Sequence, residues 1–262
     1  MEKEVFRLRK MKLSVVIIAK NAEKQIGEAI KSCSFADEVI IIDNNSQDQT
    51  PKVAEKLDAK VYAVESDNFS ELRNIGIEKS NGEWILYIDS DERVTKELSS
   101  KIISQIQKET FFSAYRLNRK NFYFGNYEWP YIERLERLFK KNNLKNWYGQ
   151  LHESPIVDGP IGELHGFLLH YTHQDLESML NKTIEWSKIE AELRFKSNHP
   201  KMTWWRFPRV MIKAFINSYI TQGGWKAGAT GIVEGTYQAF SIFITYARLW
   251  ELQEKVMKKN EI

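Results

Sequence analysis

The sequence of 262 residues predicts an α/β protein with a mostly parallel sheet flanked by helices, followed by a C-terminal helical, amphipathic extension. Three observations lead to this prediction. Short β-branched runs alternate with segments of helical spacing along the first part of the chain. The connections between these segments are short, as in parallel sheets built with right-handed crossovers. The last third changes to long segments with helical periodicity.

The first strand is predicted at Leu13–Ala19, where a continuous apolar run (LSVVIIA) is typical of a strand buried on both faces. Helical spacing follows at Ile26, Ala29 and Ile30. A second apolar run, Val39–Ile42, predicts the next strand. The alternation of strand and helix therefore begins close to the start of the chain.

The pattern continues through two more strands. A helix is predicted to begin at the Thr50-Pro51 pair, because proline is favoured in the first helical turn. Lys60–Val64 predicts a short third strand. Asn68–Lys79 has helical spacing and is closed by an Asn-Gly turn, and Trp84–Ile88 (WILYI) predicts the fourth strand.

Polar side chains gather where these strands end. Asn21 follows the first strand, Asp43 the second, and Asp89 and Asp91 the fourth. In parallel sheets, ligands bind beyond the carboxyl ends of the strands. The sequence therefore predicts a ligand site at this edge of the sheet.

The composition excludes several classes of protein. Hydrophobic residues make up 42% of the chain and aromatic residues 13%, which argues against disorder. The single cysteine, Cys33, excludes an internal disulfide and a cysteine-based zinc site. A net charge of +3 is too small to indicate nucleic acid. No apolar run reaches the ~18–20 residues that span a bilayer, and the first residues (MEKEVFRLRK) do not resemble a signal peptide. We therefore expect a soluble or peripheral cytoplasmic protein.

The familiar phosphate-binding motifs are missing. No G-x-G-x-x-G follows the first strand and no G-x-x-x-x-G-K-[ST] occurs, which disfavours dinucleotide-binding dehydrogenases and P-loop NTPases. The Asp-x-Asp pair at Asp89 and Asp91 offers another solution. Two carboxylates at a strand end can hold a hard divalent cation, which then bridges diphosphate oxygens.

Three sequence blocks, in this order over residues 12–100, resemble the nucleotide-sugar domain of family 2 glycosyltransferases, which have the GT-A fold: SVVIIAKNAE, EVIIIDNNSQDQT and RNIGIEKSNGEWILYIDSDE. Narrower motifs resemble a bacterial subgroup typified by lipopolysaccharide core glucosyltransferases. These motifs are RLF at 137–139, GQLHE at 149–153, LHYT at 169–172 and the segment 223–249. The likeness covers most of the chain. One departure is Ala227, which stands before Gly228 where this subgroup leads us to expect an acidic residue.

The resemblance implies roles for the donor site. Residues around Ala19, Asn21 and Asp43 would hold the nucleoside, with Asp43 accepting hydrogen bonds from uracil or ribose. Arg73 would face the base or the diphosphate. Asp89 would contact the ribose or a metal ion.

The resemblance also implies a Mn²⁺ or Mg²⁺ ion, with Asp91 as the direct ligand and Asp89 beside it. His152 is a candidate to ligate the metal or touch the diphosphate, and His170 is its rival. Glu153 is the candidate base that activates the acceptor hydroxyl. The simpler alternatives are that Glu153 is a surface carboxylate and that the histidines have packing roles.

The acceptor side is predicted from aromatic residues, whose faces stack on sugars. The stretch from Phe122 to Trp129 (FYFGNYEW), together with Tyr131, would line an acceptor cleft or form a hydrophobic flap. Arg137 and His170 are further acceptor candidates.

The last third combines cations with aromatic residues. After a predicted helix at Leu176–Phe195, seven basic residues occur from Arg194 to Lys226 without an acidic one. Such a composition is typical of a segment lying on an anionic membrane surface. The alternatives are a helical hairpin packed on the catalytic domain and, without any supporting motif, nucleic-acid binding.

We accordingly divide the chain by expected role into an N-terminal extension (1–11), a nucleotide-sugar half (12–110), an acceptor and catalytic half (111–175) and a helical, membrane-proximal extension (176–262). The predicted function is inverting, metal-dependent transfer of a sugar from a nucleotide diphosphate sugar to a lipid-linked saccharide such as the lipopolysaccharide inner core. The expected sugar is glucose, and the expected nucleotide is UDP. The enzyme would act at the inner face of the bacterial cytoplasmic membrane. Alternatives are a peptide or polyprenyl-linked acceptor, a sugar nucleotidyltransferase, and a non-catalytic membrane-associated scaffold.

Overall fold

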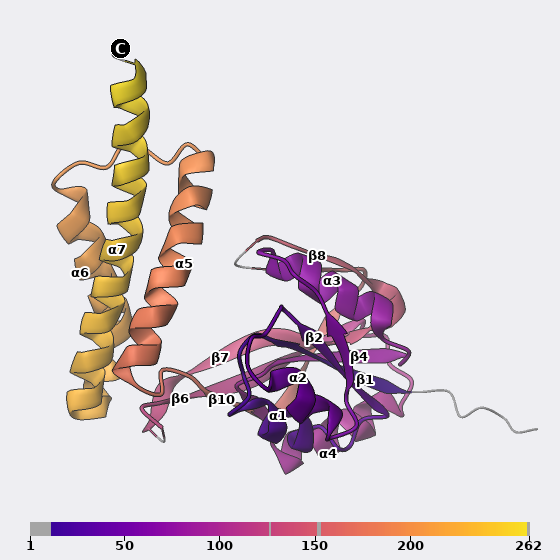
Figure 1. Cartoon of the computed structure of the whole chain (residues 1–262). Coiled ribbons are helices and arrows are strands. Elements are labelled where there is room, and N and C mark those ends of the chain that lie inside the picture. Colours follow the sequence, from indigo (N-terminus) through magenta and orange to yellow (C-terminus); the bar gives the residue numbers. More distant parts are fainter. Residues whose placement is uncertain (1–11, 126, 151–152, 261–262) are drawn as a thin grey trace, which may run out of the picture. The chain divides into compact units, whose positions relative to one another are not determined.

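The structure is a computed structural model that describes residues 12–125, 127–150 and 153–260, with side chains as far as residue 256 (Figure 1). The chain divides into two compact units. The first contains the described residues up to Lys120 together with Glu133–His170, and the second contains Asn121–Ile132 and the described residues from Tyr171 onward. The predicted extension over residues 1–11 lies outside the described residues.

Four parallel strands form one half of an eight-stranded sheet. In spatial order they are β3 (Lys60–Ala63), β2 (Glu38–Asp43), β1 (Leu13–Ala19) and β4 (Trp84–Asp89). The register pairs Ala19 with Asp43 on one side of β1, and Ile18 with Asp89 on the other. The polar ends of β2 and β4 therefore flank the end of β1.

The other half of the sheet contains antiparallel strands. These are β7 (Tyr127–Lys140), β6 (Ala114–Tyr123), β10 (Ile161–Tyr171) and β5 (Glu92–Val94). β7 runs antiparallel to β4, and β10 antiparallel to β5. A short 3₁₀ turn, η1 (Lys141–Asn143), leads to a separate two-stranded sheet made of β8 (Leu144–Tyr148) and β9 (Ser154–Val157).

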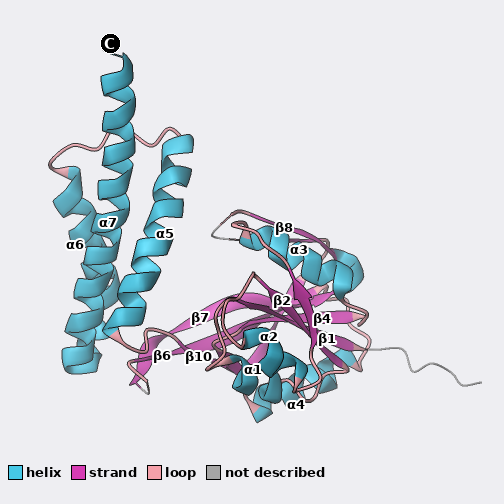
Figure 2. Cartoon of the chain, viewed as in Figure 1, coloured by secondary structure: helices cyan, strands magenta, loops and turns pink. Residues whose placement is uncertain are grey.

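Helices cover both faces of the first unit's sheet (Figure 2). They are α1 (Ile26–Ser32), α2 (Thr50–Glu55), α3 (Phe69–Lys79) and α4 (Lys96–Ile106). Alternate residues of β1 point to opposite faces. Val15 and Ile17 join the core shared with α1, α2 and α4, whereas Val16 and Ile18 join the core shared with α3 and β8. A strand buried on both sides is what the apolar run predicted.

Local sequence signals set how α3 presents its side chains to the sheet edge. Asn68 caps the helix, because its side chain accepts a hydrogen bond from the Ser70 amide. A Cβ at Gly76 would lie 2.6 Å from Cγ1 of Val16, so this glycine lets α3 pack directly on β1. This close packing holds Arg73, one helical turn earlier, near the end of β4.

The second unit is mainly helical. It contains α5 (Leu176–Lys196), α6 (Arg206–Ile216), the π-helical turn η2 (Asn217–Thr221), the 3₁₀ turn η3 (Gly224–Ala227) and α7 (Gly228–Asn260). Both α5 and α6 pack on α7 (Figure 1). Ala191, Met202 and Leu249 form a core between these helices. None of the helices within the described residues is long and apolar enough to cross a membrane.

The predicted fold class is confirmed. The four predicted strands and the helices at 68–79 and 176–195 all form within a residue of their predicted bounds. The antiparallel strands β6, β7 and β10 were not predicted individually. The division of the chain into four segments by expected role does not follow from the two compact units, and it stays a prediction.

Candidate active site

Three strand ends create the candidate site at the carboxyl edge of the parallel strands. Ala19 ends β1, Asp43 ends β2 and Asp89 ends β4. Hydrogen bonds join the loops that follow. The Asn44 amide donates to the Ala19 carbonyl at 2.8 Å, and the Asn21 amide donates to Oγ of Ser46 at 2.9 Å. Asn21 has a φ of 50°, in the left-handed region, which asparagine tolerates better than most residues.

Asp43 is buried with an unsatisfied oxygen. Its side chain is 3% exposed, and Oδ2 accepts a hydrogen bond from the Ser46 amide at 3.1 Å. Oδ1 has no hydrogen-bond partner among the described residues. A buried carboxylate oxygen without a donor is costly, so this atom is suited to accept a hydrogen bond from a ligand.

Asp89 lies at the centre of a network of arginines. Its Oδ2 accepts from Nη2 of Arg137 at 2.7 Å, and its Oδ1 accepts from Nη2 of Arg73 at 3.1 Å. Burial alone would raise the pKa of Asp89, but Arg137, Arg73 and Arg119 outweigh burial and hold this pKa well below its usual value. Asp89 is therefore a carboxylate.

Glu92 is a second buried carboxylate that binds the same arginines. Its side chain is fully buried, accepts hydrogen bonds from Arg119 at 2.8 Å and Arg137 at 3.2 Å, and accepts one from the Asp89 amide at 2.9 Å. Arg119 also donates to Glu133 at 2.7 Å. Burial would lower the pKa of Arg137, but Asp89 and Glu92 raise it above its usual value. The pairs compensate one another, as buried charges must.

Arg73 joins Asp89 to Glu153. Its Nε donates to Oε1 of Glu153 at 2.7 Å, and its guanidinium lies over the Trp147 ring, 4.9 Å from the centroid. Tyr87 donates to the Arg73 carbonyl at 2.8 Å. Nη1 of Arg73 is buried and has no hydrogen-bond partner in the described part of the chain. The same side chain thus orients two carboxylates and still offers a donor to a ligand.

Asp91 and His170 form a second pair beside this network. Oδ2 of Asp91 lies 3.2 Å from Nε2 of His170, and both side chains are partly exposed. The pair forms because β10 runs antiparallel to β5, with His170 opposite Glu92. A carboxylate and an imidazole suit Mn²⁺, and they suit Mg²⁺ less well.

These residues fit a divalent cation only in part. Both oxygens of Asp89 accept hydrogen bonds from arginines, so Asp91 and His170 are the better placed ligands. No group of three or more His, Cys, Asp or Glu side chains is arranged as a metal site in residues 12–125, 127–150 and 153–256. Diphosphate oxygens and water would have to complete the coordination. The other candidate ligand, His152, lies outside the described residues.

The acceptor candidates have different environments. Tyr131 is 45% exposed, which suits a residue that contacts a ligand. Trp129 is 1% exposed; it packs on Tyr123 and donates to Gln222 at 3.2 Å, so its ring belongs to the interior of the second unit. Arg137 is 6% exposed and points to Asp89. The buried positions of Trp129 and Arg137 favour packing and positioning roles over contact with an acceptor.

Sequence reasoning missed Arg119, Glu92 and Glu133. Glu92 is the last residue of the DSDE segment at 89–92, but nothing in the local sequence distinguished it from a turn residue. Arg119 and Glu133 come from β6 and β7, and only the antiparallel pairing of the sheet brings such residues to the end of β4.

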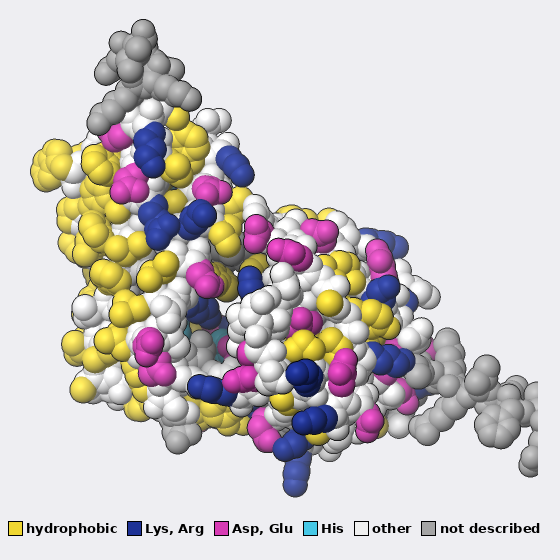
Figure 3. Space-filling view, viewed as in Figure 1, with side chains coloured by type: hydrophobic (Ala, Val, Ile, Leu, Met, Phe, Trp, Pro, Cys, Tyr) yellow, Lys and Arg dark blue, Asp and Glu magenta, His cyan; other side chains and the backbone are white. Residues whose placement is uncertain are grey.

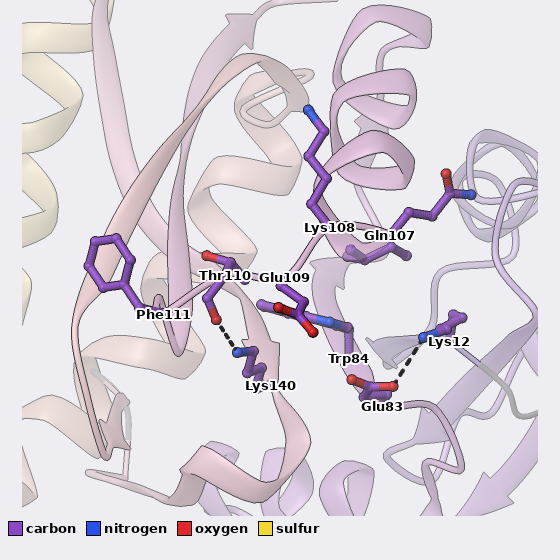
Figure 4. A pocket seen from close by; sticks show the side chains of 10 residues that line it. Lys12, Glu83, Trp84, Gln107, Lys108, Glu109, Thr110, Phe111 and Lys140 are labelled. Atoms are coloured by element: carbon purple, nitrogen blue, oxygen red, sulfur yellow. Dashed lines mark hydrogen bonds and ion pairs between the residues drawn. The ribbon is translucent and has the colours of Figure 1, made fainter.

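A cavity of about 800 Å³ lies elsewhere in the first unit (Figure 4). Lys12 and Trp84, which line it, stand at the amino ends of β1 and β4. Lys12 is paired with Glu83, and Lys140 donates to the Thr110 carbonyl at 2.6 Å. None of the candidate site residues lines this cavity, so it is separate from the site at the carboxyl edge.

The fold and the site are those of an α/β protein with a cluster of charged residues at the carboxyl edge of its parallel strands, and comparison with known proteins specifies the family. Residues 14–155, more than half of the chain, match the family model described as glycosyl transferase family 2. The chain therefore belongs to family 2 of the glycosyltransferases, and it is a glycosyltransferase. This confirms the family and the activity class predicted from the motifs.

Similar proteins support the same assignment over nearly the full length. The lipopolysaccharide core biosynthesis glycosyltransferase LpsC of Rhizobium meliloti is 24% identical, covering 92% of this chain and 93% of the relative. An uncharacterized glycosyltransferase of Rickettsia typhi is 28% identical, covering 93% and 88%. Among solved structures, the mannosyltransferase PcManGT from Pyrobaculum calidifontis, in complex with GDP-Man and Mn²⁺, is 12% identical with a TM-score of 0.53, covering 93% and 88%. This last likeness shows the GT-A fold.

Proposed function

We propose that this glycosyltransferase transfers a sugar, with inversion, from a UDP-linked donor to a lipid-linked saccharide such as the inner core of lipopolysaccharide. The observation that carries the proposal is the position of Arg73 between Asp89 and Glu153. One arginine thus joins the carboxylate expected to bind the donor to the carboxylate expected to activate the acceptor.

The donor would be held by atoms that lack partners within the protein. The unsatisfied Oδ1 of Asp43 suits an N–H of uracil or a ribose hydroxyl. The unsatisfied Nη1 of Arg73 suits an oxygen of the base or the diphosphate. Asp89, held ionised by its arginines, suits a ribose hydroxyl.

A Mn²⁺ or Mg²⁺ ion would be held by Asp91 and His170. Such an ion supplies positive charge that stabilises the departing diphosphate. The mannosyltransferase of similar fold was solved with Mn²⁺ and GDP-Man, which supports this use of a divalent cation.

Glu153 would act as the general base. The acceptor hydroxyl transfers its proton to a carboxylate oxygen of Glu153 while the hydroxyl oxygen forms a bond to the anomeric carbon. The bond from that carbon to the diphosphate breaks, and its electron pair leaves with the nucleoside diphosphate. Attack from the face opposite the leaving group inverts the anomeric configuration. The hydrogen bond from Arg73 orients Glu153 for this step.

The choice of acceptor and location follows the relative LpsC, whose name links it to lipopolysaccharide core biosynthesis. By analogy, we propose glucose as the sugar, and peripheral binding at the inner face of the bacterial cytoplasmic membrane as the location. Peptide or polyprenyl-linked acceptors, or a scaffold without turnover, are the alternatives that the test must separate.

The test is a transfer assay with purified protein, Mn²⁺ and a panel of UDP-sugars. Each donor is offered a truncated lipopolysaccharide core, a polyprenyl phosphate saccharide or a peptide, and both the product and released UDP are measured. We expect one donor to give product with the lipopolysaccharide core. Product with the polyprenyl or peptide acceptor alone would contradict the proposed acceptor, and donor binding without any product would favour the scaffold.

A further inference from the structure

The second unit exposes a row of isoleucines along α6 and η2. Ile212, Ile216 and Ile220 follow one another at every fourth residue, a spacing that places them on one side of a helix. Their exposed fractions are 58%, 48% and 55%. Figure 3 shows hydrophobic side chains gathered over α6 and the adjoining part of α7.

The packing of α6 on α7 does not need this row. The other side of α6 faces α7: Phe207 lies 5.9 Å from Phe243 between ring centroids, and a Cβ at Gly235 would lie 3.2 Å from the Phe215 ring. Glycine at 235 therefore lets Phe215 pack closely. Because aromatic side chains make the contact between α6 and α7, the isoleucine row stays exposed in the folded unit.

Basic residues and tryptophans border the isoleucine row. Arg209 and Lys213 are exposed and alternate with the isoleucines along α6. Trp205, before α6, lies under the guanidinium of Arg209 at 5.9 Å. At the other end, Trp225 in η3 is 56% exposed, with the Lys226 ammonium 5.3 Å from its ring.

The same part of the chain carries no exposed carboxylate. From Arg194 to Trp250 the sequence contains a single acidic residue, Glu234. Glu234 is 1% exposed, lies 3.0 Å from Nδ1 of His173 and accepts a hydrogen bond from Gln238 at 2.7 Å. The surface of α6, η2 and η3 is therefore cationic and apolar together.

We propose that this surface docks on an anionic phospholipid bilayer. We call it the α6 face and define it by Trp205, Arg209, Ile212, Lys213, Ile216, Ile220 and Trp225. The isoleucines would enter the boundary between headgroups and acyl chains, the cations would contact lipid phosphates, and the tryptophans would lie at headgroup depth. This inference rests on the proposed function in one respect: a lipid-linked acceptor lies in a bilayer, so the enzyme has to bind there to reach it.

Other partners fit the α6 face less well. A second copy bound through the same face in a two-fold dimer would bring Arg209 and Lys213 of both chains together without carboxylates to offset them. Nucleic acid would satisfy the cations but leave the isoleucines in water. An anionic bilayer offers phosphates to the cations and an apolar phase to the isoleucines.

The test is co-sedimentation of the full chain with two kinds of vesicle, one of phosphatidylcholine and one of equal parts phosphatidylcholine and phosphatidylglycerol. The variant Ile212→Ser/Lys213→Glu alters the α6 face. The matched control is Ile184→Ser/Lys188→Glu on α5, where Ile184 is 57% exposed. Circular dichroism shows that each variant is folded.

We expect the wild-type protein and the control to bind the phosphatidylglycerol vesicles and to bind phosphatidylcholine vesicles weakly. The α6-face variant should bind the anionic vesicles about 30-fold less tightly, because reversing one charge near such a surface removes two units of attraction. Wild-type protein that fails to sediment, or an equal loss in the control, would overturn the proposal. A concentration-dependent dimer that the α6-face variant abolishes would assign the face to a second copy instead.

Binding of UDP-sugars, measured in the same proteins without vesicles, separates this inference from the proposed function. Both variants should bind the donor as the wild type does. Wild-type protein that binds a UDP-sugar but not the anionic vesicles overturns the membrane face alone, whereas wild-type protein that binds the vesicles but no nucleotide sugar overturns the proposed function alone.

Discussion

Each unit of this protein contains a region that departs from ordinary residue distribution, and the two regions do so in opposite directions. The first buries charges: Glu92 is fully buried, and Arg137 is 6% exposed. The second exposes apolar side chains, among them Ile212 at 58%. Charged residues are rarely buried unless paired, and contiguous exposed apolar surface usually marks a binding site. Both departures therefore identify places where the structure serves something besides folding.

The two departures differ in how they are compensated. The buried charges of the first unit satisfy one another, since Asp89 and Glu92 are both paired with arginines. The exposed isoleucines of the second unit have no such compensation within the fold. The buried site is thus explained by contacts within the protein, whereas the α6 face is explained by the bilayer that we propose as its partner.

The largest effect is expected at Glu153. Replacing Glu153 with Gln keeps the shape of the side chain but removes the base, so transfer should fall by about 1,000-fold. Donor binding, measured by calorimetry, should be unchanged. The control is Glu136→Gln, which alters a carboxylate that also bonds an arginine, Arg116, at the surface of the same unit. If both variants lose activity equally, Glu153 has a structural role.

The next effect concerns stability. Arg137→Met would leave Asp89 and Glu92 with one fewer buried cation, and the free energy of unfolding should fall by about 3–5 kcal/mol. Denaturant unfolding measures this loss. Exposed Arg134, which lies 3.5 Å from Glu163, is the matched control, and Arg134→Met should cost less than about 1 kcal/mol. Equal effects would mean that the buried network contributes little.

A smaller effect is expected at Glu38, at the opposite end of β2 from the site. Burial would raise the pKa of this carboxyl, but hydrogen bonds from Lys60, Ser14 and Asn81 lower it to about 2. Because the folded-state pKa is depressed, the stabilisation is complete above the ordinary pKa of 4.5 and is lost as the pH falls towards about 2.

Glu38→Gln should therefore flatten the loss of stability between those two pH values and lower stability at neutral pH by about 2 kcal/mol. Thermal unfolding across the acid range measures both changes. Donor binding at neutral pH should stay intact, because Glu38 begins β2 and the site lies beyond the end of that strand. Lost donor binding in a folded variant would show that the two ends of the sheet are coupled.

The smallest effect is predicted at Cys33. Burial raises the pKa of this thiol to about 12, and the side chain is fully enclosed in the core of the first unit. Alkylation of the native protein should therefore be slow and should report opening of that core. The rate should be the same in the wild type and in Ile212→Ser/Lys213→Glu. A faster rate in the variant would show that the α6 face stabilises the first unit.

The sequence allowed the parallel strands and their polar ends to be predicted because those signals are local. Asp43 and Asp89 each follow an apolar run. Because ligands bind beyond the carboxyl ends of parallel strands, both residues could be placed at a ligand site. Arg119 and Glu133 escaped prediction because they depend on antiparallel register. Arg137 and His170 were predicted as site residues, but the contacts that they make with carboxylates were not, for the same reason. Arg137 reaches Asp89 from β7, and His170 reaches Asp91 because β10 pairs with β5.

The helical unit shows a similar limit. The cation-rich, aromatic composition after Arg194 was visible in the sequence, but the side of α6 that packs on α7 was not. Trp129 illustrates the difficulty, since an aromatic residue expected to line a cleft is 1% exposed. The composition predicted a binding surface, and only packing shows which side chains are exposed on it.

Calorimetric titration of UDP-sugars with and without Mn²⁺ tests the central claim most directly. The wild type and Asp91→Ala are compared, with Asp158→Ala, an exposed aspartate elsewhere in the first unit, as the control. We predict that one UDP-sugar binds in a Mn²⁺-dependent manner to the wild type and the control, and that Asp91→Ala loses this dependence. Binding that is unaffected by Asp91→Ala would contradict the assigned metal ligand, and the absence of any nucleotide-sugar binding by folded protein would contradict the account of the site as a whole.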